Sequence, residues 1–219
     1  MDRFRARLRG FGPVGLVAIV IVLVVGFFIT PLGALVALIW TWISKTPWRD
    51  IGFVRPKSWW KTILLGLVLG SALKLLMKTV VMPLLGAPAI NPAFHYLAGN
   101  TAAIPGILLV VIVGAGFGEE MLFRSYLFER LGKLLGQRAG AKTFIVLVTS
   151  MLFAAAHYSG QGLPGVEQAM FSGLTFGAIL AVTGGVFLPM IMHAAFDITA
   201  VAIIYYDVEA TFAHFFFKS

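Results

Sequence analysis

Long runs of apolar residues, separated by short polar stretches, make up most of the chain. Six such segments lie near residues 12–44, 62–82, 103–128, 143–157, 165–183 and 185–206. Within them the apolar character continues over roughly 15 positions or more, whereas a strand of a membrane barrel alternates apolar and polar residues over about ten. The pattern therefore predicts helices that cross a membrane, each needing about 20 residues at a rise of about 1.5 Å.

The first segment is too long for one crossing, and Pro31 followed by Gly33 interrupts it near its middle. Basic residues stand on both sides of it, at Arg3, Arg5, Arg7 and Arg9 before it and at Lys45, Arg49, Arg55, Lys57 and Lys61 after it. Because short cytoplasmic loops collect Lys and Arg, both ends should lie on the same side of the membrane. We therefore expect residues 12–44 to form a tight pair of helices, which makes seven spans in all.

The remaining charges agree with this topology. Residues 79–123 contain no Lys or Arg, and the basic residues return between Arg130 and Lys142. The topology predicts a cytoplasmic N terminus and a C terminus outside. The segment "WRDIGFVRPKSWWK", residues 48–61, mixes Trp, Phe and basic residues, and we expect it to lie along the cytoplasmic face of the membrane.

Composition supports the same class of protein. Of the 219 residues 59% are hydrophobic and 12% are charged, where soluble domains average about 25% charged residues. We expect one all-α, polytopic membrane domain over residues 1–219, a bundle of about seven transmembrane helices plus the interfacial segment. The net charge of +8 gathers at segment ends, so nucleic acid is not an expected partner, and the absence of cysteine excludes a disulfide or a thiolate nucleophile.

A few ionisable residues interrupt the predicted spans. They are Glu119, Glu120, Arg124, His157, His193 and Asp197, with Lys74 and Lys78 on the third span. Each such group costs on the order of 3 kcal/mol in a bilayer unless it faces the bundle or water. Taken singly, each has a structural explanation: an ion pair, a packed histidine, or a lysine that reaches the interface or faces the interior of the bundle. Together they indicate one polar cavity.

The spacing of the ionisable residues predicts different roles for the two glutamates. Glu120 and Arg124 are four residues apart, so they share a helix face and can form an ion pair. Glu119 is turned away from Glu120 by about 100° in a regular α-helix, which leaves its carboxylate free for chemistry. His193 and Asp197 repeat the four-residue spacing on the last span.

Three motifs resemble those of a known family. "EEMLFR" at 119–124 fits the pattern E-E-x-x-x-R, "FAAAH" from Phe153 to His157 fits F-x-x-x-H, and "HAAFD" from His193 to Asp197 fits H-x-x-x-N/D. In order and approximate separation they resemble the CAAX-protease and bacteriocin-processing (CPBP) family of intramembrane endopeptidases. The resemblance covers residues 116 to about 200.

The resemblance implies a glutamate-dependent endopeptidase that cleaves a membrane-associated peptide or protein and lies in a bacterial or archaeal cell membrane. Glu119 would be the general base, His157 would orient the water, and His193 with Asp197 would stabilise the oxyanion. Glu120 and Arg124, with Phe153, would support the site. No cofactor or metal is implied. Asp197 stands where the family often has Asn, and an ionised Asp cannot donate a hydrogen bond; it would be protonated, or would orient His193.

Depth along the spans is a further constraint. Counting about 1.5 Å per residue places Glu119 and His193 roughly 10 Å from the cytoplasmic boundary but His157 roughly 20 Å from it. Tilted spans, a fifth span that begins in the cytoplasm, or a loop at 157–165 that dips into the bundle would bring them together. We expect the dipping loop, and a cavity that opens to the cytoplasmic leaflet.

Other functions remain possible for the same residues. Glu119, Glu120, His157, His193 and Asp197 are all potential metal ligands, although H-E-x-x-H is absent. Ionisable groups in a bundle also serve proton-coupled transporters, but no internal repeat is visible. The third alternative is a scaffold or immunity protein without catalytic activity.

Overall fold

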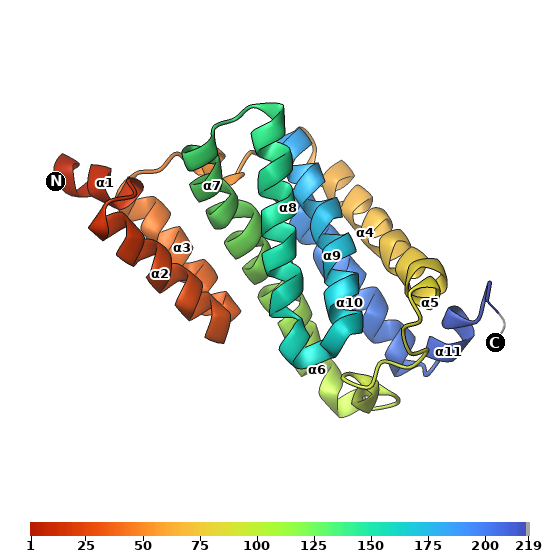
Figure 1. Ribbon diagram of the computed structural model, residues 1–219. Coiled ribbons are helices and arrows are strands. Elements are labelled where there is room, and N and C mark those ends of the chain that lie inside the picture. The colour runs from red at the N-terminus through yellow and green to blue at the C-terminus, as the bar shows by residue number, and fades with distance from the viewer. Residues whose placement is uncertain (218–219) are drawn as a thin grey trace.

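The computed structural model describes residues 1–217 as a bundle of helices (Figure 1), with no strand in that range. The N-terminal helices are α1 (Asp2–Arg9), α2 (Pro13–Phe28), α3 (Thr30–Ser44), α4 (Trp59–Leu76) and α5 (Met82–Leu84). The later helices are α6 (Ile104–Leu109), α7 (Leu127–Leu135), α8 (Ala139–Ala156), α9 (Tyr158–Thr183), α10 (Phe187–Tyr205) and α11 (Glu209–Ala213). A π-helical turn, Met77–Val81, joins α4 to α5, and a longer π-helical segment, η5 (Val110–Tyr126), joins α6 to α7. Short 3₁₀ turns are η1 (Trp48–Ile51), η3 (His95–Leu97) and η4 (Thr101–Ala103).

The all-α membrane bundle is confirmed, but the count of seven spans is not. Five helices of the described chain are long and apolar enough to cross a membrane, or six if the bent pair of α1 and α2 counts as one span. The helix α3 falls short because it has only 15 residues, about 22 Å at the helical rise.

The first apolar segment folds as the expected pair of helices. The chain reverses at Ile29, and Pro31 lies in the first turn of α3, where its missing N–H costs no helical hydrogen bond. At Gly33 a Cβ atom would overlap the backbone of Gly26 on α2. Two glycines therefore let α2 and α3 approach closely.

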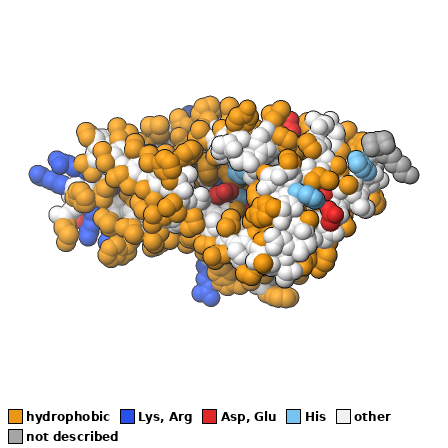
Figure 2. Space-filling view, turned by 90° about the horizontal axis from the view of Figure 1, so that it is seen from below, with side chains coloured by type: hydrophobic (Ala, Val, Ile, Leu, Met, Phe, Trp, Pro, Cys, Tyr) orange, Lys and Arg blue, Asp and Glu red, His pale blue; other side chains and the backbone are white. Residues whose placement is uncertain are grey.

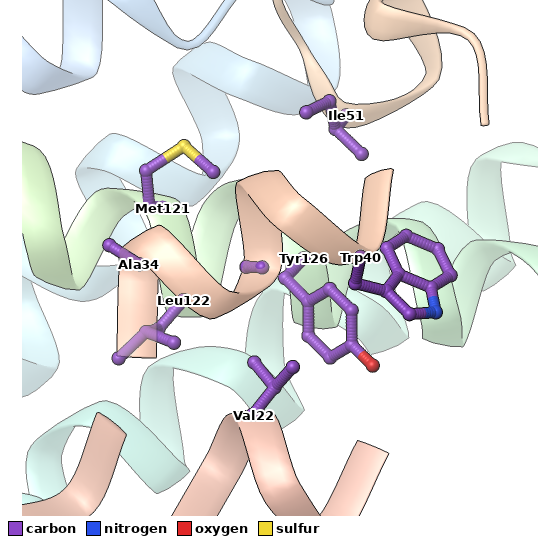
Figure 3. Close-up of a cluster of buried hydrophobic side chains, with 8 residues drawn as sticks. Val22, Ala34, Trp40, Ile51, Met121, Leu122 and Tyr126 are labelled. Atoms are coloured by element: carbon purple, nitrogen blue, oxygen red, sulfur yellow. The ribbon is translucent and has the colours of Figure 1, made fainter. Parts of the chain in front are cut away.

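This helical pair packs on η5 through a cluster of buried side chains (Figure 3). The cluster combines Val22, Ala34, Ala37 and Trp40 from α2 and α3 with Ile51, Met121, Leu122 and Tyr126. The rings of Trp40 and Tyr126 meet edge to face, with centroids 5.0 Å apart. Since Met121 and Leu122 directly follow Glu120, this packing sets the rotation of η5 and thus the direction of its carboxylates.

The central helical run is continuous from Thr101 to Leu135 and carries the motif 119–124 in its π-helical part. A π-helix closes hydrogen bonds to the fifth residue back and is rare, but it is frequent at functional sites. The regular α-helix expected from the sequence is therefore wrong here, although Glu120 and Arg124 still face each other.

Two further pairs of helices complete the frame of the bundle. On α4, Gly66 lies against Ile191 and Gly70 against the carbonyl of Met192 on α10. The helices α8 and α9 are joined at His157 alone, and α9 is kinked at Gly162, which has φ of 63°. The expected loop at 157–165 is thus a helical turn followed by a kink.

The segment predicted to lie along the interface is mostly irregular. It contains η1 and an extended stretch, and Ser58 accepts a hydrogen bond from the Lys61 N–H to cap α4. The carbonyl of Gly52 accepts from the N–H of Val186, which ties the segment to the start of α10.

We predict that Gly70→Ala destabilises the bundle by about 1–3 kcal/mol, because the added methyl group forces α4 and α10 apart. Thermal unfolding in detergent measures the loss. The matched control is Gly106→Ala on α6, where a Cβ atom meets nothing within 4 Å. Equal unfolding temperatures for the two variants would contradict this packing.

Candidate active site

All four predicted catalytic residues line one cavity of about 170 Å³. Glu119 comes from η5, His157 from the junction of α8 and α9, and His193 and Asp197 from α10. The three motifs, far apart in the sequence, therefore meet at one place in the bundle.

His193 lies at the centre of this group. Its Nδ1 is 2.8 Å from Oε1 of Glu120, and its Nε2 is 3.7 Å from Oε2 of Glu119 and 3.6 Å from Oδ2 of Asp197. Because a carboxylate only accepts, Nδ1–H donates to Glu120. The imidazole thus bridges the supporting glutamate and the two carboxylates of the cavity.

The two glutamates have different surroundings. The side chain of Glu120 is fully buried, with its Oε1 3.1 Å from Nη1 of Arg124, whereas the side chain of Glu119 is 23% exposed. The Arg124 N–H groups do not point at the carboxylate well enough for a hydrogen bond, so the contact is an ion pair only. Glu120 is held on two sides, and Glu119 faces the cavity.

Phe153 is the common neighbour of these groups. Its ring centroid is 4.2 Å from Cζ of Arg124, 4.6 Å from the ring of His157 and 5.8 Å from the ring of His193. A guanidinium over an aromatic face is attracted by the ring quadrupole. The first residue of the F-x-x-x-H motif therefore contacts members of all three motifs.

His157 reaches the cavity although the count along the spans placed it at another depth. Its Nδ1 is 2.8 Å from the Phe153 carbonyl oxygen, to which it donates, so Nε2 is the nitrogen left for other partners. The chain after His157 folds back along the cavity, which Gln161 and Gln168 also line. The return is made by the first turns of α9 and not by a loop.

Gln168, which lies beside this group, was not identified from the sequence, and its partner is Lys74. Lys74 is only 8% exposed, and its Nζ donates to Oε1 of Gln168 over 2.7 Å. Lys74 and Gln168 both line the 170 Å³ cavity, and both also line a larger cavity of about 580 Å³ that adjoins it. Lys78, one turn further, instead pairs with Glu209 over 3.3 Å. Both lysines therefore face the interior of the bundle and do not reach the membrane interface. Nothing in the spacing marked Gln168 as a neighbour of α4.

The cavity reaches the end of the bundle that carries the 86–104 segment and the start of α9, since Asn91, Phe94, Leu97 and Gln161 line it. Figure 2 views this end, where acidic and histidine side chains lie among apolar ones from the middle of the surface to its right side. The basic segments 2–9, 45–61 and 130–142 belong to the opposite end (Figure 1). The cavity therefore extends toward the end opposite to the basic segments, and not toward the basic end at which the opening was expected.

Within residues 1–217, no group of three or more His, Asp or Glu side chains is arranged to hold a metal ion.

Comparison with known proteins adds the family. The family model described as "Type II CAAX prenyl endopeptidase Rce1-like" matches residues 101–199, the part of the chain that carries all three motifs. Neither the curated proteins nor the solved structures gave a match. Over these residues the chain is similar to type II CAAX prenyl endopeptidases, and the match supports the resemblance of its three motifs to the CPBP family of intramembrane endopeptidases.

Proposed function

We propose that the chain hydrolyses a peptide bond in a membrane-associated peptide or protein, with Glu119 as the base that activates water. The observation that carries this proposal is the contrast between the two glutamates. Glu120 is buried and engaged by Arg124 and His193, whereas Glu119 has a partly exposed carboxylate in the cavity that His157, His193 and Asp197 share.

In the proposed reaction, Glu119 takes a proton from a water molecule while the water oxygen attacks the carbonyl carbon of the substrate. The carbonyl oxygen becomes an oxyanion, which needs donors placed in advance. When His193 is protonated, its Nε2–H points into the cavity and can supply such a donor, because Nδ1–H is already used by Glu120. The proton on Glu119 then passes to the amide nitrogen, and the C–N bond breaks.

His157 and Asp197 have supporting roles in this proposal. The Nε2 of His157 orients the attacking water, since Nδ1 is fixed on the Phe153 carbonyl. Asp197, with Oδ2 3.6 Å from Nε2 of His193, orients the imidazolium through its negative charge and leaves Nε2–H for the oxyanion. This role agrees with the second alternative for Asp197 and needs no protonated carboxyl group.

The adjoining cavity of about 580 Å³ offers room for substrate residues that flank the cleaved bond. Its wall is largely apolar and includes Met82, Ile90 and Ile203, which suits apolar side chains. We also infer that the basic end of the bundle faces the cytoplasm, because short cytoplasmic loops collect Lys and Arg.

We predict that Glu119→Gln lowers peptide cleavage by about 100-fold or more, the usual contribution of a general base. Mass spectrometry of membrane-protein fragments, from cells with matched expression of wild type or variant, would detect termini that depend on Glu119 and identify the substrate. The matched control is Glu167→Gln on α9, a glutamate outside the catalytic cavity. Identical fragments from wild type and a folded Glu119→Gln variant would favour a scaffold or transport function.

We predict a different result for Glu120→Gln, which should reduce stability as well as activity. Removing one partner of a buried ion pair costs about 3–5 kcal/mol, because the other charge stays uncompensated. Unfolding measured for Glu120→Gln, Arg124→Met and the double variant forms a thermodynamic cycle. Strictly additive losses would show that the 3.1 Å contact contributes nothing.

We predict that Glu119-dependent cleavage survives treatment with a chelator, because the proposed mechanism needs only protein groups and water. The measurement compares fragment formation by purified protein before and after chelation, together with atomic absorption of the protein. Loss of cleavage that added zinc restores would establish the metal-dependent alternative.

A further inference from the structure

A second large cavity lies at the basic end of the bundle, away from the catalytic group. Its volume is about 660 Å³, and it lies between η1, α7, the start of α8 and the end of α9. Its charged lining residues are Arg49, Asp50, Arg124, Glu129, Lys133 and Lys142. The catalytic cavity shares none of these residues, and of them the proposed protease mechanism involves only Arg124, as the partner of Glu120.

The charges of this cavity do not balance. Both oxygens of Glu129 accept from Arg130, with the Nη2 contact at 2.7 Å, and Asp50 lies 3.6 Å from Nε of Arg49. Lys142 reaches only the carbonyl of Ala181, at 3.4 Å. Among residues 1–217, neither Lys133 nor Lys142 has a carboxylate within 4.0 Å. Two ammonium groups therefore remain without an anion.

The inner wall of the cavity includes Arg124, which is fully buried. No nitrogen of its guanidinium has a hydrogen-bond partner in the described part of the chain, although Nη1 lies near Glu120. Buried donors are normally satisfied, so such a group marks a place for a further acceptor. A cluster that served only to orient the protein in the membrane would need neither a cavity nor this buried guanidinium.

Apolar side chains stand at the edge of the same cavity. Val182, which lines it, is 87% exposed, and Leu134 and Leu135 on the neighbouring turn of α7 are 60% and 42% exposed. Cations inside and apolar side chains outside match the two parts of a phospholipid, because phosphate oxygens accept charge-assisted hydrogen bonds and acyl chains bury apolar surface.

We propose that this cavity binds a phosphate group, supplied by the headgroup of an anionic phospholipid, through Lys133, Lys142 and the buried guanidinium of Arg124. The site goes beyond the proposed protease activity and does not depend on it. Arg49 adds positive charge at the rim.

Native mass spectrometry and thermal unfolding of the delipidated protein in a neutral detergent test the proposal. The probes are phosphatidylglycerol, phosphatidylcholine and inorganic phosphate, each added alone. We expect one tightly retained phosphatidylglycerol and a raised unfolding temperature. Binding should be about fivefold or more weaker in Lys133→Gln/Lys142→Gln, which removes two ionic contacts of modest strength. Phosphatidylcholine has the same phosphate but no net charge and should bind less.

The matched control is Lys57→Gln/Lys61→Gln, which removes two positive charges from the same end of the bundle but outside the cavity. Equal losses in the two double variants would overturn the proposal, as would equal retention of both lipids by the wild type. Inorganic phosphate that stabilises the wild type but not Lys133→Gln/Lys142→Gln would support the phosphate site and identify free phosphate as its source. Lys133→Gln alone, at an exposed position, serves if the double variant does not fold.

Discussion

The structure depends on the way in which the buried carboxylate of Glu120 is compensated. A charge without a partner is too costly inside a lipid-embedded bundle. Arg124 from the same π-helical segment and His193 from α10 both contact its Oε1, at 3.1 and 2.8 Å. One oxygen atom thus joins η5 to α10 and fixes the imidazole that faces Glu119. The hydrophobic packing of Met121 and Leu122 on α2 and α3 holds the same segment from the other side.

Much of the fold could be predicted because the bilayer imposes strong rules. Apolar length identified the later helices to within seven residues at each end, and Pro31 with the flanking basic residues identified the α2 and α3 pair. Length alone could not show that α3 has just 15 residues. The π-helical winding of η5 was also out of reach, because a difference of one residue per turn leaves little trace in a uniformly apolar sequence. The kink at Gly162 depends on a local backbone angle that composition does not reveal.

For the candidate site, the sequence predicted which residues meet but not how they are connected. Spacing along one helix indicated the pair of Glu120 and Arg124, whereas the contact of Glu120 with His193 crosses 73 positions of sequence and follows only from packing. The end of the bundle toward which the cavity extends was not predictable for a related reason. Counting residues along each span gives a depth, but the cavity is also lined by residues of the 86–104 segment and α9, whose positions depend on tertiary packing.

The attachment of His193 restricts what can approach it. With Nδ1 engaged by Glu120, a small molecule that enters the 170 Å³ cavity can address the ring only through Nε2. There it also meets the carboxylates of Glu119 and Asp197, both within 4 Å of that nitrogen. An inhibitor group that carries a negative charge would be repelled by these two carboxylates. A compact group that places one acceptor toward the ring and donors toward the carboxylates would match the cavity, so the pattern of donors and acceptors would govern selectivity more than apolar bulk.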